Sequence, residues 1–191
     1  MHDLYSFVTG PLAWAAFIVF IAGSLYRLIN MLYLVNKKEK FIYTYMSFKY
    51  SFRSIFHWII PFATLNWKKH PVLTIVTFAF HLCLVITPVF LLSHAILWDE
   101  SWNISLWTLP DGVADIMTLI VIGSCIFFLV RRLVSPEVQY VTSASDYVIL
   151  AIVALPFITG FIAYHQWFNY PFFMILHILS GEIMLVAIPF T

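Results

Sequence analysis

The sequence has few charged residues. Only 10% of its 191 residues are Asp, Glu, Lys or Arg, whereas 62% are hydrophobic. Soluble globular domains carry about 25% charged residues, which cover their water-facing surface. This composition therefore excludes a soluble globular protein, and the lipid bilayer is the expected surrounding. No nucleic-acid partner is expected.

Other features are also missing. The two cysteines, Cys83 and Cys125, have no CxxC spacing, so neither a disulfide framework nor a cysteine metal site is indicated. The chain has no internal repeat, low-complexity tract or Gly/Ser linker, and we predict one membrane domain over residues 1–191. The first apolar stretch is too long for a secretory signal and lacks a basic n-region, so we expect it to be retained as a helix.

Long apolar runs are abundant. A membrane-spanning helix needs about 20 consecutive apolar residues. Five stretches meet this requirement, over residues 11–35, 71–98, 112–130, 147–164 and 171–191. We therefore predict an all-α membrane protein with a bundle of five transmembrane helices.

Basic residues are missing from two of the four loops between these stretches. The first loop carries seven Lys and Arg residues, and the third begins with Arg131 and Arg132. The charged residues of the second loop are all acidic, and the fourth loop has no charged residue. Short basic loops stay in the cytoplasm. This pattern predicts a periplasmic N-terminus and a cytoplasmic C-terminus in a multi-pass protein of the inner (cytoplasmic) membrane.

The first loop is unusually aromatic. Between residues 41 and 67, Phe, Tyr and Trp alternate with Lys49, Arg53 and His57. Such a mixture is typical of a segment that lies at the headgroup level. We predict an amphipathic interfacial segment on the cytoplasmic face, which either docks a peripheral subunit or serves as a membrane-surface anchor.

Histidines are the residues that point to a function, because ionisable groups inside a bilayer usually mark a pathway or a cofactor. His70, His81 and His94 fall along the predicted second helix, and His177 falls on the fifth. A six-coordinate haem b needs two neutral imidazoles from different helices. His70 and His81 would lie about 16 Å apart on one helix face, a spacing that suits two stacked haems. Depth alone leaves open whether His81 or His94 faces His177.

Two other charged residues fall inside the predicted helices. Arg27 is expected in the inner half of the first helix, where it would contact a haem propionate. Glu182 is expected near the middle of the bilayer, where a hydrogen bond to a neighbouring helix is the simplest way to satisfy it.

Several segments carry a family resemblance: GSLYR (23–27), HLCLVITP (81–88), RRLVSPEV (131–138), SDY (145–147) and LHILSGEIMLVAIPFT (176–191). With these segments the chain resembles the gamma subunit of respiratory nitrate reductase, a dihaem cytochrome b with five helices. It is most similar to relatives of that subunit, the membrane cytochrome b subunits of anaerobic sulfur-metabolism electron-transfer complexes. The resemblance extends over most of the chain.

The resemblance implies a ligand set for two b haems in the full-length protein. His81 and His177 would hold the iron of the outer haem, and His70 would hold the inner one together with a second His of the fifth helix. That second His lies about five turns beyond His177. We therefore expect the natural chain to continue past Thr191 with this ligand.

The resemblance also implies electron transfer in anaerobic respiration. Electrons would pass through the b haems between menaquinone, or a periplasmic multihaem cytochrome, and a cytoplasmic iron-sulfur subunit. Quinone chemistry releases or takes up protons, so titratable groups are needed. His165, Asp99 and Glu100 are the candidates at the outer end. Such a chain would be the electron-transfer subunit of an oxidoreductase complex.

Two other classes are compatible with a polytopic chain. One is a haem-free membrane anchor that tethers a peripheral redox enzyme. The other is a transporter, which is disfavoured because the sequence shows no inverted halves and no pair of broken helices. A reduced-minus-oxidised spectrum separates the first alternative from a haem protein.

Overall fold

Five helices are long and apolar enough to cross a membrane, as the sequence predicts. The computed structural model describes residues 2–191, and within that range all regular secondary structure is helical, with no strand. The five candidate spans are Asp3–Lys38, Pro71–Phe90, Asp111–Val134, Ala144–Tyr164 and Tyr170–Phe190. The protein is therefore an all-α, multi-pass membrane protein.

The first span is the longest and is built from three consecutive pieces. These are α1 (His2–Phe7), a π-helical turn η1 (Val8–Leu12) and α2 (Ala13–Lys38). The remaining elements, in chain order, are α3 (Ile42–Tyr45), α4 (Phe48–Ile59), α5 (Leu65–Lys69), α6 (Pro71–Phe90), α7 (Leu92–Trp102), α8 (Asp111–Val134), α9 (Pro136–Val141), α10 (Ala144–Tyr164), α11 (Tyr170–Ala187) and a 3-10 turn η2 (Ile188–Phe190).

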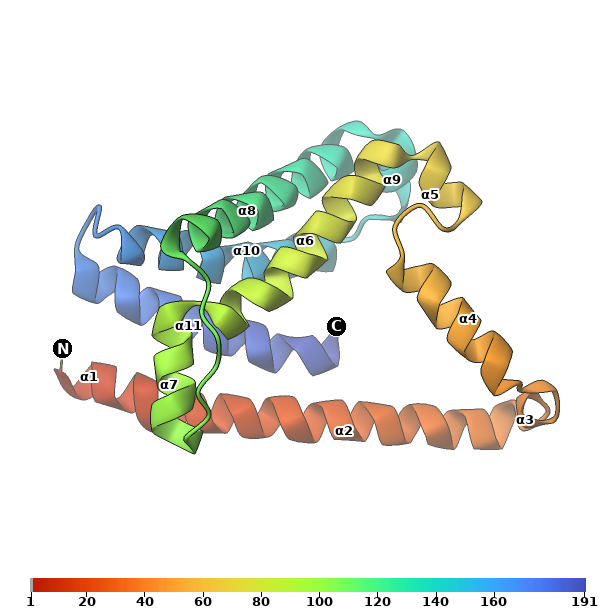
Figure 1. The fold of residues 1–191 in the computed structure, drawn as a ribbon, viewed down its shortest axis with the longest axis horizontal. Coiled ribbons are helices and arrows are strands. Elements are labelled where there is room, and N and C mark those ends of the chain that lie inside the picture. Colours follow the sequence, from red (N-terminus) through yellow and green to blue (C-terminus); the bar gives the residue numbers. More distant parts are fainter. Residues whose placement is uncertain (1) are drawn as a thin grey trace.

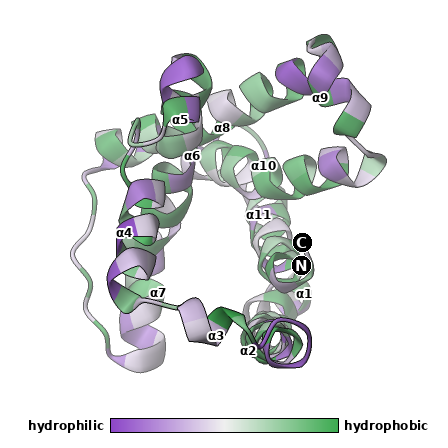
Figure 2. Ribbon diagram, turned by 90° about the vertical axis from the view of Figure 1, so that its right-hand side faces the viewer, coloured by the Kyte–Doolittle hydropathy of each residue, from purple (hydrophilic) through white to green (hydrophobic). Residues whose placement is uncertain are grey.

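The buried core lies between α6, α8 and α10. Phe80 and Cys83 of α6 pack with Val121 and Cys125 of α8 and with Phe157 of α10. Small side chains at the two cysteines let the helices approach closely, and the phenylalanines fill the remaining space. Outside this core, many large apolar side chains are exposed to the surroundings. The hydropathy colouring of Figure 2 shows that hydrophobic residues predominate along the long helices. In a bilayer these side chains contact lipid.

The first span packs mainly against the end of the chain. Helix α2 runs beside α11 and extends well past η2, as seen in Figure 1. At the point of contact, a Cβ on Gly23 would lie 2.9 Å from the ring of Pro189. Two of the segments that carry the family resemblance, residues 23–27 and residues 176–191, are therefore in contact with each other.

The second span is shorter than predicted. A single helix over residues 71–98 is wrong, because α6 ends at Phe90 and Leu91 is extended (ψ 134°). Pro88 has no N–H to donate and weakens the last turn of α6. The Phe90 carbonyl accepts a hydrogen bond from the Leu109 amide (2.9 Å) instead of continuing the helix. Helix α7 then turns across the bundle (Figure 1).

Aromatic contacts hold α7 in that position. The ring of Trp102 packs edge-on against Trp14 and Phe17 of α2, at centroid distances of 6.1 and 6.0 Å. The α7 helix thus bridges the first span and the end of α6. His94 belongs to this crossing helix rather than to the second span.

The predicted interfacial segment over residues 41–67 consists of α3, α4 and the beginning of α5. None of the residues in these three helices is buried. These basic elements and α9 lie at one end of the molecule, whereas the α10–α11 connection lies at the opposite end (Figure 1). This arrangement agrees with loops that alternate between the two ends of the bundle. Which end faces the cytoplasm stays a prediction.

Candidate functional site: the His94–His177 pair

Two histidines from different helices lie close together with nearly parallel rings. The imidazole planes of His94 on α7 and His177 on α11 are 10° apart, and their ring centroids are separated by 5.9 Å. Both rings are partly buried. The break at Leu91 creates this arrangement, because α7 turns back over the bundle and carries His94 toward α11.

The orientation of each ring is fixed by a backbone carbonyl. Nδ1 of His94 lies 2.8 Å from the carbonyl oxygen of Pro88, and Nδ1 of His177 lies 2.9 Å from that of Pro156. A carbonyl only accepts, so each Nδ1 carries the proton and donates it. In a neutral ring the lone pair is then on Nε2. Metal-bound histidines usually have this arrangement, with the other nitrogen tied to a carbonyl or carboxylate.

Burial also favours the neutral form of His94. Loss of solvent lowers the pKa of His94 from its ordinary value, and the hydrogen bond to Pro88 opposes this shift only in part. A neutral imidazole is the form that binds a metal ion, since a proton would otherwise occupy the ligating lone pair.

His177 is held against α10 by a close approach of the two helices. A Cβ on Gly160 would lie 2.8 Å from both Cε1 and Nδ1 of the His177 ring, closer than real contacts allow. One turn away, the hydroxyl oxygens of Thr159 and Ser180 are 3.3 Å apart, and Ser180 also donates to the His177 carbonyl (2.9 Å). Glycine and hydroxyl side chains of this kind allow close helix packing in membranes.

His94 and His177 would be the residues that hold a haem iron here, because they are imidazoles from different helices with ring centroids 5.9 Å apart. Iron held by a porphyrin needs only two protein ligands. Within residues 2–191 no group of three or more His, Cys, Asp or Glu residues is placed to hold a metal ion by itself.

The other histidines proposed as ligands lie elsewhere. His81 is exposed on α6, and its Nδ1 contacts the Thr77 carbonyl oxygen of its own helix (2.7 Å). His70 is exposed at the N-terminal cap of α6. The structure thus brings His94, and not His81, to His177. The sequence did not indicate this pair, because a continuous second helix would place His94 further along the same axis.

Arg27 is paired with the end of the chain. Its Nη1 donates to the carbonyl oxygen of Pro189 at 3.1 Å. The guanidinium therefore satisfies a carbonyl of the last turn, and a contact with a haem propionate stays a prediction.

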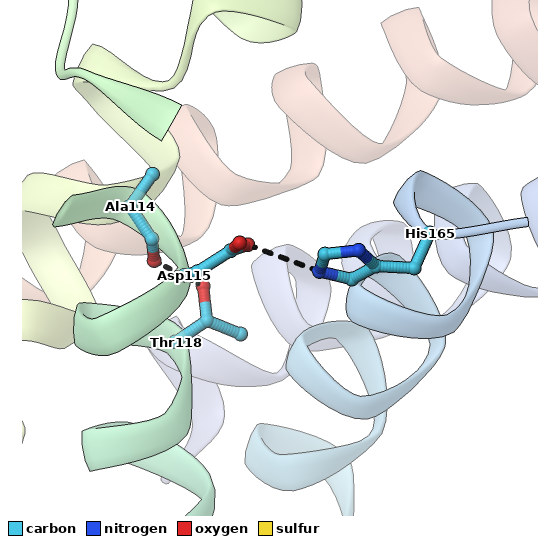
Figure 3. Close-up of polar contacts among 4 residues, drawn as sticks. All are labelled: Ala114, Asp115, Thr118 and His165. Carbon is cyan, nitrogen blue, oxygen red and sulfur yellow. Dashed lines mark hydrogen bonds and ion pairs between the residues drawn. The ribbon is translucent and has the colours of Figure 1, made fainter. Parts of the chain in front are cut away.

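A second polar pair lies at the α10–α11 end. Nε2 of His165 is 3.3 Å from Oδ1 of Asp115 on α8, as Figure 3 shows. The His165 ring also stacks on Trp167, with 5.5 Å between centroids. Of the two other candidates, Asp99 accepts a hydrogen bond from Ser105 (2.7 Å) and Glu100 is exposed. Sequence reasoning missed Asp115, although a carboxylate one turn inside an apolar span is a detectable signal.

A protein of Nitratidesulfovibrio vulgaris (strain Hildenborough), described only as "Protein", is 34% identical to this chain over 192 residues. The match covers 98% of this chain and 85% of the relative. The chain belongs to the same family. The aligned region covers nearly the whole helical bundle. The description of the relative names no ligand or partner. No protein-family model and no solved structure matches the chain.

Proposed function

We propose that this protein is the haem b subunit of an anaerobic respiratory complex and transfers electrons across the membrane. The observation that carries the proposal is the His94–His177 pair. Its two rings are parallel, come from different helices, and each has Nδ1 bound to a carbonyl. This would leave two Nε2 atoms free to hold one haem iron.

The protein's own contribution is to bind and orient. Pro88 and Pro156 fix the tautomer of the two histidines through their carbonyl oxygens, and Gly160 makes room for the His177 ring. A haem b held there would supply an iron that gains and loses one electron at a time. The apolar residues of the surrounding helices limit access of water, which favours binding by neutral imidazoles.

The proposed electron carriers lie on the two sides of the membrane. Menaquinone, or a periplasmic multihaem cytochrome, would exchange electrons with the haem, and a cytoplasmic iron-sulfur subunit would complete the path. The basic and aromatic face of α4, with Arg53 over the ring of Tyr50 (5.7 Å), is the proposed dock for that subunit. This assignment puts the basic end in the cytoplasm and both the N-terminus and the His165–Asp115 pair on the periplasmic side.

Proton exchange with quinone is assigned to the His165–Asp115 pair. An imidazole can take up and release a proton, and a carboxylate 3.3 Å away can orient it. Asp99 and Glu100 remain candidates at the same end. His70 is the proposed ligand of a second haem.

The test is a reduced-minus-oxidised absorption spectrum of the purified protein, followed by addition of a menaquinol analogue. We expect the alpha band of a low-spin b haem, and we expect the quinol to reduce part of it. A protein that purifies folded but lacks the band would instead be a haem-free anchor.

A further inference from the structure

Two buried hydroxyl side chains face each other across the α10–α11 interface, close to His177. Thr159 of α10 is 3% exposed and Ser180 of α11 is 5% exposed, and their hydroxyl oxygens are 3.3 Å apart. Thr159 lies three residues from Pro156, whose carbonyl binds the His177 ring, and Ser180 lies three residues from His177 itself. Each hydroxyl is therefore within one helical turn of one partner in the ring–carbonyl hydrogen bond.

The hydroxyl protons have nearby backbone acceptors. Thr159 donates to the Leu155 carbonyl at 2.7 Å, and its oxygen is also 3.4 Å from the Pro156 carbonyl oxygen. Ser180 donates to the His177 carbonyl at 2.9 Å. A hydroxyl has one proton and two lone pairs, so the Thr159 oxygen can still accept from Ser180. The two side chains thus connect the turn that contains Pro156 with the backbone of His177.

The surroundings make this contact hard to replace. A bilayer offers no water to a polar group that loses its partner, and hydroxyl side chains between membrane helices hold the helices together. Glu182, the other buried polar residue of α11, has no hydrogen-bond partner within the described part of the chain, so the predicted bond to a neighbouring helix is absent. Ser180 is the buried polar side chain that links α11 to α10.

We propose that Thr159 and Ser180 are positioning residues that hold the His177 ring on the Pro156 carbonyl and thereby set how strongly His177 binds iron. The effect on the iron rests on the proposed function, whereas the effect on the ring does not. A hydrogen bond from Nδ1 makes the imidazole a more basic ligand, and a more basic ligand favours oxidised iron. Loss of either hydroxyl lets α10 and α11 separate, which weakens the Nδ1 hydrogen bond and raises the midpoint potential.

The test compares Thr159→Val and Ser180→Ala in the full chain, in lipid nanodiscs. Nuclear magnetic resonance of isotope-labelled histidine follows the Nδ1 proton of His177, which is assigned by its absence in His177→Ala, and a potentiometric titration gives the midpoint potential. We expect this proton to move upfield and to exchange faster with water in both variants, and the potential to rise. Ser124→Ala is the matched control, because Ser124 is equally buried but donates to Ile120 of its own helix.

Two further variants separate the hydroxyl contact from packing. Thr159→Ser keeps the hydroxyl and should restore the wild-type signal and potential, and the double variant should change no more than the stronger single one, because both remove the same contact. An unchanged Nδ1 proton in Thr159→Val and Ser180→Ala would overturn the inference, as would an equal change in Ser124→Ala or a failure of Thr159→Ser to restore it. A protein that lacks haem but shows the predicted proton shifts would refute the proposed function and leave the positioning role standing.

Discussion

The ring of His177 lies directly against Gly160, where any side chain would collide with it. A Cβ at that position would be 2.8 Å from two ring atoms. The same ring donates to the Pro156 carbonyl one turn earlier on α10. Helix α10 therefore both holds the proposed ligand and leaves no room for it to move toward α10.

Gly160→Ala should displace the His177 ring and lower the haem content of the purified protein. Overpacking of this kind also costs about 1–3 kcal/mol of stability. Haem per polypeptide, measured from the reduced spectrum, is the readout. Gly181→Ala is the control, because a Cβ on Gly181 meets nothing within 4 Å. Full haem content in Gly160→Ala would contradict the assigned role of this contact.

Gly23→Ala should loosen the contact between the first span and the end of the chain. The new Cβ would lie 2.9 Å from Pro189, so α2 and η2 must separate. We expect the stability to fall by about 1–3 kcal/mol, measured by circular dichroism during thermal unfolding in detergent. Gly123→Ala, with open space around its Cβ, should unfold like the wild type. Equal midpoints for the two variants would show that this packing is unimportant.

Arg27→Met should weaken the same contact without changing the haem. The substitution removes the hydrogen bond to the Pro189 carbonyl, worth about 0.5–1.5 kcal/mol. Pro189 follows His177 by twelve residues, about 18 Å along the axis, so the midpoint potential of the His94–His177 haem should stay the same. A potentiometric titration checks this. A lower potential in Arg27→Met that Arg27→Lys restores would instead support a contact with a propionate.

Asp115→Asn should slow the reduction of the haem by quinol while leaving the fold intact. The His165–Asp115 pair is partly exposed, with about 30% of each side chain accessible, so its loss should cost less than about 1 kcal/mol. Stopped-flow spectroscopy of haem reduction measures the rate. Asp99→Asn serves for comparison, because the Asp99 carboxylate is bound to Ser105 and not to His165. A slower rate only in Asp99→Asn would place the proton exchange in the second loop.

The sequence predicted the five spans because each is set by the length of an apolar run, a local property. It did not predict the break at Leu91, because apolar residues continue past it and hydropathy is insensitive to one extended residue. The position of His94 depends on that break, so the pair with His177 could not be deduced from helical spacing. Glu182 was visible as an intramembrane charge, but its lack of a partner depends on how α2 packs against α11.

The proposed function depends on His94 and His177 being ligands of one haem. Reduced-minus-oxidised spectra of His94→Ala, His177→Ala and His81→Ala test it most directly, with size-exclusion chromatography to confirm folding. The alpha band of this haem should disappear in the first two variants and persist in His81→Ala. Loss of the band in His81→Ala together with its retention in His94→Ala would contradict it.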